Sequence, residues 1–259
     1  MRSATIGGEV DGHGAAGAAS APERIDRSIT RAILRGTYPP GTHLPTLRTL
    51  AEEHEVNLST MQRALARLER RGLITARQGS GLLVNDPHEV GDLSLVADWL
   101  AVTADDPARA AAILADLLDV RRAIAARLIV RHRLAVLDAL GDLVEGAASL
   151  VGLPLEGVWQ ADVAVARAVV GATGNAVAGA VLTTVLRVLD ELPVLVAAMY
   201  AEPETNAASM LEVGAALRDG GPDLGARIEA AMAMVDERTV ARFRDLLARE
   251  VAAREVVAP

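Results

Sequence analysis

From residue 93 to residue 255, apolar side chains recur at intervals of three and four residues, and no stretch alternates as a strand would. This spacing is typical of helices that bury one face. Aromatic residues make up only 2% of the chain, so Ala, Leu and Val must form the core. The sequence therefore predicts an all-α bundle of about seven helices, with periodic segments at 109–133, 134–147, 158–174, 176–200, 207–217, 224–235 and 237–252.

Charge divides the chain into two parts. Residues 23–85 hold ten Arg against six acids, a net charge of +4, and residues 86–259 hold 15 Arg against 26 acids, a net charge of −11. A basic module on an acidic body suits a nucleic-acid-binding domain carried by one that avoids nucleic acid. We expect a flexible tail (1–20), a basic domain (21–85), a linker (86–92) and a helical domain (93–255).

Several classes of protein are disfavoured by composition. Cysteine and lysine are both absent, which leaves no disulfide, no thiolate metal site and no lysine for Schiff-base or Walker chemistry. Neither a G-x-S-x-G elbow nor a Ser, His and Asp cluster is present, so we do not expect an enzyme. No uncharged apolar run is long enough to span a bilayer, so we expect a cytoplasmic, nucleoid-associated protein with no membrane contact.

The basic domain reads as three helices followed by a hairpin. Ile25, Ile29 and Ile33 recur at helical spacing in a first helix that ends at Gly36. A proline-rich loop leads into a second helix at 46–55, and Asn57 is placed to cap a third. Two apolar runs then flank QGSG, which predicts a two-stranded wing.

The start of the third helix carries polar side chains that suit contacts with base edges, at Ser59, Thr60, Gln62 and Arg63. Farther along the same helix, Arg67, Arg70 and Arg71 are expected to be surface charges. These features together are those of a winged helix-turn-helix.

The stretch PPGTHLPTLRTLAEEHEVNLSTMQRALARLERRGLITARQGSG resembles the DNA-binding domain of the GntR family of bacterial transcription regulators. It keeps the PPG and LP loop, an Arg three residues after that Pro, LxxLERRGLI and the QGSG tip. With the polar helix face, the resemblance implies DNA contacts at Arg48, Leu58, Ser59, Thr60, Gln62, Arg63, Gln78 and Gly79. Leu58 and Gln62 stand where the FadR subfamily usually has Arg, so a different operator sequence is expected.

The helical part resembles the effector domain of the FadR subfamily, through LLDVRRAIAARL, ADVAVARAVVGATGNAVAGAVL and MYAEPE. Many members of that subfamily bind a divalent metal with one Asp and three His. Here Asp162 keeps the acid, but Ala166, Met210 and a residue near Met232 occupy the His positions. We therefore expect neither a metal nor another cofactor, and His132 is expected on a helix surface.

The resemblance also implies an effector site at Arg121, Trp159, Asp162 and Asn175. Arg121 falls where the family binds the effector's carboxylate, although an internal ion pair with Asp162 or Asp119 is an equal alternative. Trp159 either walls the pocket or fills core space. Asn175 either lies beside the pocket or is a left-handed helix cap.

These features predict a homodimeric repressor that binds an inverted-repeat operator in double-stranded DNA. A small acidic metabolite or an acyl-CoA-type ligand, bound in the helical domain, would release it. The alternative is a DNA-binding adaptor whose helical domain binds a protein partner and no metabolite.

Overall fold

The computed structural model describes residues 19–77, 79–145 and 151–257. The chain divides into two compact units, one up to Val90 and one from Gly91 onward. Among the described residues, none of the helices combines the length and apolar character needed to cross a bilayer.

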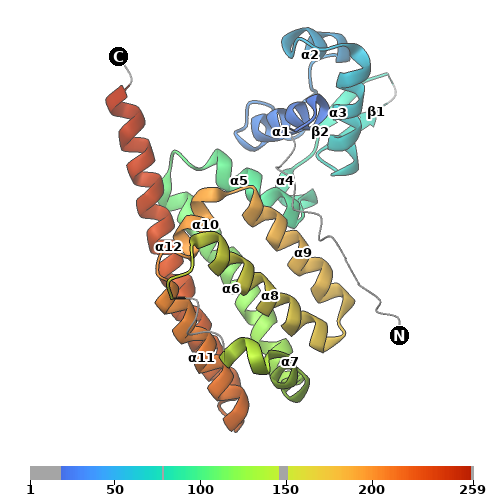
Figure 1. The fold of residues 1–259 in the computed structure, drawn as a ribbon. Helices are drawn as coiled ribbons and strands as arrows, with labels where there is room; N and C mark the ends of the chain where they lie inside the picture. Colours follow the sequence, from blue (N-terminus) through green and yellow to red (C-terminus); the bar gives the residue numbers. More distant parts are fainter. Residues whose placement is uncertain (1–18, 78, 146–150, 258–259) are drawn as a thin grey trace, which may run out of the picture. The chain divides into compact units, whose positions relative to one another are not determined.

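The first unit contains α1 (Ala21–Leu34), α2 (Leu47–Glu53) and α3 (Leu58–Arg70), and both α1 and α2 pack on α3 (Figure 1). The isoleucines predicted to face inward from α1 are buried. At the start of α3, Oδ1 of Asn57 accepts a hydrogen bond from the backbone nitrogen of Thr60 at 2.8 Å. This confirms the predicted N-cap and fixes where α3 begins.

The predicted wing is present as the antiparallel pair β1 (Ile74–Arg77) and β2 (Gly81–Val84), with Ile74 opposite Val84. Gly81 has a φ of +91°, which favours glycine at the turn. The segment predicted as a linker contains one short helix, α4 (Pro87–Val90). The side chain of Asp86 holds its first turn by accepting from the backbone nitrogen of His88 at 2.9 Å.

The second unit is all helical in its described residues, as predicted. A short 3-10 helix, η1 (Leu93–Leu95), precedes α5 (Val96–Val102), α6 (Pro107–Arg131), α7 (Arg133–Glu145), α8 (Leu155–Thr173), α9 (Ala176–Asp190), α10 (Pro193–Met199), α11 (Pro203–Asp219) and α12 (Leu224–Val257).

Two boundaries differ from the sequence prediction. The segment 176–200 forms two helices, because Pro193 has no backbone N–H to donate and starts α10 instead. The segments 224–235 and 237–252 form one helix of 34 residues, because no Gly or Pro interrupts the chain between 226 and 257. The short α5 lies outside the predicted stripes.

The core of the second unit comprises two clusters. Phe243 and Leu247 of α12 belong to one cluster, with residues of α5, α6, α8, α9 and α10. Ile228, also in α12, belongs to the other, with residues of α6, α7, α8 and α11. Figure 1 shows α12 running along the side of the bundle, and it packs mainly on α6, α10 and α11. Like α6 and α8, α12 thus contributes to both clusters.

Candidate functional site

The first two turns of α3 present an exposed face. Leu58, Ser59, Gln62 and Arg63 are all exposed, and their spacing places them on one side of the helix. The hydroxyl of Ser59 donates to Oδ1 of Asn57 at 2.8 Å, so the cap also orients this side chain. The Leu58 side chain is apolar yet 49% exposed, which leaves it available for contact with a thymine methyl group.

Thr60 was predicted to contact DNA, but it is buried, with 8% of its surface exposed. It precedes Met61 at the edge of the apolar stripe and faces inward, so its side chain does not belong to the exposed face. On α2, the side chain of Arg48 is 85% exposed and pairs with Glu52 at 3.0 Å. Gly79 lies exposed at the wing tip with a φ of +80°, and Gln78 falls outside the described residues.

Two arginines at the far end of α3 have a structural role that the sequence prediction missed. Asp26 of α1 is buried, and it contacts Nε of Arg67 at 3.4 Å and Nη1 of Arg71 at 3.5 Å. Arg71 also donates to the hydroxyl of Thr30 at 3.1 Å. A buried carboxylate requires such partners. Arg67 and Arg71 therefore tie α3 to α1, whereas Arg70 is exposed as predicted.

The helical unit contains a partly open cavity of about 290 Å³. Its walls come from both core clusters and are mostly small or branched apolar side chains of α6, α8, α9, α11 and α12. A smaller lobe of about 50 Å³ shares Arg121 and Asp162 with the main cavity and is closed by Trp159. Trp159 thus walls the lobe, and it also packs against the core.

Four positions were predicted to lie at or near the metal ligands of the FadR subfamily, and all four lie in the wall of this cavity. Asp162, Ala166, Met210 and Met232 all line it. The described residues contain no group of three or more His, Asp or Glu placed to hold a metal ion. At these positions the cavity therefore offers one carboxylate, a methyl group and two thioethers.

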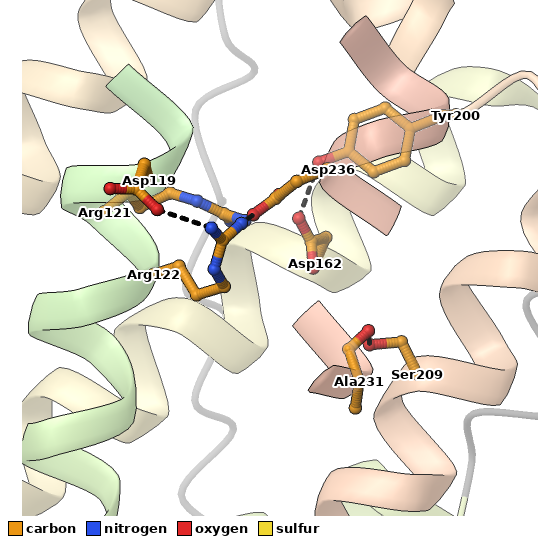
Figure 2. A network of polar contacts seen from close by, with 8 residues as sticks. All are labelled: Asp119, Arg121, Arg122, Asp162, Tyr200, Ser209, Ala231 and Asp236. Atoms are coloured by element: carbon orange, nitrogen blue, oxygen red, sulfur yellow. Dashed lines mark hydrogen bonds and ion pairs between the residues drawn. The ribbon is translucent and has the colours of Figure 1, made fainter. Parts of the chain in front are cut away.

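A polar network lies at one side of the cavity (Figure 2). Asp236 of α12 is buried, with Oδ1 2.6 Å from Nη2 of Arg121 and Oδ2 2.8 Å from Nη1 of Arg122. Arg122 also contacts Asp119 at 2.5 Å. Burial raises the pKa of Asp236, and the two guanidinium groups oppose that rise. Arg121 therefore forms an internal ion pair, which was one of the two alternatives, but its partner is Asp236 and not Asp162 or Asp119.

Asp162 has a different partner. The hydroxyl of Tyr200 donates to its Oδ2 at 2.6 Å, and the ring of Tyr200 packs edge-on against Trp159 with centroids 5.8 Å apart. Burial raises the pKa of Tyr200 strongly, and the Asp162 charge adds to that rise, so the phenol keeps its proton. Oδ1 of Asp162 has no hydrogen-bond partner among the described residues.

Asn175 lies away from the cavity lining. Its Oδ1 accepts from the backbone nitrogens of Val177 and Ala178, both at 3.1 Å, so it is the N-cap of α9. The left-handed position next to it is filled by Gly174, which closes α8. Of the two alternatives for Asn175, the helix cap is the one observed. Asn175 caps the N-terminus of α9, however, and its backbone is extended and not left-handed.

Sequence reasoning missed Tyr200, Asp236 and three further polar residues that line the cavity or hold its network, Asn206, Ser209 and Thr239. One signal was available for Asp236. It follows Ile228 and Met232 at intervals of four residues, and a carboxylate within an apolar stripe needs a cation from another element.

Comparison with known proteins connects these features to a family. Residues 22–84 match the family model described as "Bacterial regulatory proteins, gntR family". An uncharacterized HTH-type transcriptional regulator of Mycobacterium tuberculosis is 39% identical over 145 residues, which cover 56% of this chain and 54% of that protein. A protein of Erwinia tasmaniensis named fatty acid metabolism regulator protein is 29% identical over 154 residues, which cover 60% of this chain and 63% of that protein.

The chain thus spans about half the length of the first relative and less than two thirds of the second. Among solved structures, one titled for Lar, which "controls the expression of the Listeria monocytogenes agr system", has 17% identity. The match covers 89% of this chain and 98% of that one, with a TM-score of 0.41, too low to establish a shared arrangement.

A winged helix-turn-helix is a DNA-binding fold that places its third helix in the major groove. The family match of residues 22–84 identifies the type of this DNA-binding unit. Residues 22–84 are those of a GntR-type helix-turn-helix domain, and proteins named fatty acid metabolism regulator are among the relatives of the chain.

Proposed function

We propose that this regulator is a homodimeric repressor that binds an inverted-repeat operator and is released from it by a small molecule in the cavity of the helical unit. The exposed face of α3 supports the first half of the proposal. Its hydroxyl, amide and guanidinium groups offer the donors and acceptors that read base edges in a major groove. Arg48, exposed on α2, is suited to a phosphate contact.

The cavity carries the second half of the proposal. A cavity of about 290 Å³ between two core clusters has the size and apolar lining of a small-molecule site. Leu93 of η1 lines it, only three residues after Val90, where the first unit ends. A ligand that favours one position of Leu93 would therefore act on the segment that joins the two units. A protein-binding adaptor would have no need of this cavity.

The resemblance predicts an acid or an acyl-CoA-type ligand. The apolar walls suit an acyl chain, and Leu93, Val120 and Ile124 line the cavity while remaining at least 36% exposed. An acid head group is less well matched, because Arg121 is already paired with Asp236.

The test is a selection of operator sequences from a random DNA library, followed by fluorescence anisotropy with the selected and scrambled duplexes. Arg48→Ala should weaken binding to both duplexes, because it removes a phosphate contact. The slope of log K against log salt concentration should become shallower by about one. Gln62→Ala should chiefly relax base preference, by about 1 to 3 kcal/mol.

Arg249→Ala, which removes an exposed charge from α12, is the matched control and should change neither quantity. Light scattering of the complex should give two chains per duplex. Equal affinity of the parent protein for selected and scrambled DNA would refute the regulator proposal.

A further inference from the structure

The charged residues that line the cavity leave it with more acid than base. They are Arg121, Asp162 and Asp236, and Arg121 is the only cation among the described lining residues. Arg121 and Asp236 form an ion pair at 2.6 Å, and Asp236 is held in addition by Arg122. Asp162 is the remaining charge, and no guanidinium of the described residues contacts it. An anionic head group would therefore meet a carboxylate without a free cation to offset it.

One acceptor of Asp162 and one donor of Arg121 nevertheless have no hydrogen-bond partner among the described residues, and the Arg121 side chain as a whole keeps 31% of its surface accessible. Oδ2 of Asp162 is occupied by Tyr200, but Oδ1 has no hydrogen-bond partner in the described part of the chain. Nε of Arg121 is buried and has no hydrogen-bond partner there either. Arg121 and Asp162 line the main cavity and the small lobe alike, so these groups lie where the two volumes meet.

A buried donor such as Nε of Arg121 is costly unless it is hydrogen-bonded, whereas Asp162 is only partly buried, so its Oδ1 can be reached by a donor of a ligand. An ammonium head group would satisfy Asp162 but would face the guanidinium of Arg121. A carboxylate would satisfy Arg121 but would face Asp162. An uncharged group that both donates and accepts, such as a hydroxyl or a primary amide, can serve both residues without like-charge repulsion.

The remaining walls fix the rest of the ligand. Apart from the three charged residues and the neutral Asn206, Ser209 and Thr239, the lining consists of Leu, Ile, Val, Ala and Met side chains, and Val120 and Ile124 in it are exposed. Such a surface takes an alkyl chain or another apolar body.

We infer that the effector of this regulator is an uncharged amphipathic molecule, with a hydroxyl or amide head between Arg121 and Asp162 and an apolar body in the main cavity. This inference rests on the proposed function, since it names the ligand of the same cavity. It replaces the acid expected from the resemblance with a neutral head group.

Four probes with one chain length and different head groups test the inference: octanol, octanamide, octanoate and octylamine. Titration calorimetry on the full-length protein at neutral pH should show octanol and octanamide binding at least tenfold more tightly than octanoate and octylamine. Asp162→Asn keeps an oxygen acceptor for Tyr200 and removes the charge, so it should raise octanoate affinity about tenfold and lower octylamine affinity.

Glu156→Gln is the matched control, because it removes one acid from an exposed position of the same helix and should change none of the four affinities. Tighter binding of octanoate or octylamine than of octanol by the parent protein would overturn the inference. So would failure of all four probes to bind. The comparison of probes on the parent protein holds even if Asp162→Asn does not fold.

Anisotropy of the selected operator duplex, measured with each probe, separates the two proposals. Release by octanol supports both. Octanol that binds without releasing DNA leaves the ligand class intact and contradicts the release mechanism. Release by octanoate alone would leave the mechanism intact and overturn the ligand class.

Discussion

At the scale of single residues, Asp236 has the largest structural role in the polar network of the cavity. This buried carboxylate of α12 binds two neighbouring arginines of α6 at 2.6 Å and 2.8 Å. The side chains of Arg121 and Arg122 are 31% and 21% exposed, so water screens their charges only in part. The two pairs therefore contribute to the contact between the helices that dominate the bundle.

Arg121→Ala should lower the free energy of unfolding by about 1 to 3 kcal/mol, because Asp236 would keep only one of its two cations. Thermal unfolding of the full-length protein, followed by circular dichroism, measures the change. Arg109→Ala removes an exposed arginine from the first turn of the same helix and should leave the melting temperature within error. Equal melting temperatures for the two variants would show that the Asp236 pair contributes nothing to stability.

At the scale of elements, η1 has a special place. Leu93 lines the cavity, whereas Leu95 is buried, and η1 packs on α5 and α9. The short helix therefore contacts the ligand space on one side and is anchored in the bundle on the other. A ligand that displaces Leu93 would therefore also move the few residues between η1 and Val90.

Leu93→Ala should weaken the effect of ligand on DNA binding more than it weakens ligand binding itself. Coupling between sites usually amounts to a factor of about 5 to 150, and we expect this variant to lose most of it. The measurement is the ratio of DNA affinities without and with a saturating probe, such as octanol. Val177→Ala shortens an exposed side chain of α9 outside the cavity and should keep the parent ratio. A parent-like ratio for Leu93→Ala would show that η1 does not couple ligand binding to DNA binding.

The helices and the wing of the first unit were predicted closely, because the residues that indicate them lie within or beside each element. Asn57 caps α3, the isoleucines of α1 repeat at helical spacing, and glycines stand at the wing turn, all within a few positions of what they control. The bundle was predicted as a class but not in its boundaries, because Pro193 was read as part of a continuous stripe. The partner of Arg121 lies 115 positions away, and helical periodicity carries no information about which helices pair.

At the scale of the whole molecule, a basic unit is joined to an acidic unit, and the described residues that line the cavity do not form a metal site. Ala166, Met210 and Met232 line that cavity, at or near the positions where many members of the FadR subfamily are expected to have His, and Asp162 alone cannot hold a divalent cation. Methyl and thioether groups make the same positions apolar.

Exhaustive treatment with a chelator should therefore change neither the melting temperature nor the response to ligand. Added Zn²⁺ or Mn²⁺ should not raise the melting temperature of the treated protein. The double variant Ala166→His with Met210→His supplies two imidazoles beside Asp162, so a gain of Zn²⁺-dependent stability there would show that the assay can detect a site. Loss of the ligand response in the chelated parent protein would contradict a metal-free cavity.

The length of α12 has a consequence for synthesis on the ribosome. The ribosome makes these 34 residues after every other described element, and they supply Ile228 to one core cluster and Phe243 and Leu247 to the other. Neither cluster can close until α12 has emerged, whereas the head is complete at Val90 and can fold while translation continues. A nascent chain stalled before α12 would thus display a finished DNA-binding unit whose regulatory unit could not yet fold or bind a ligand.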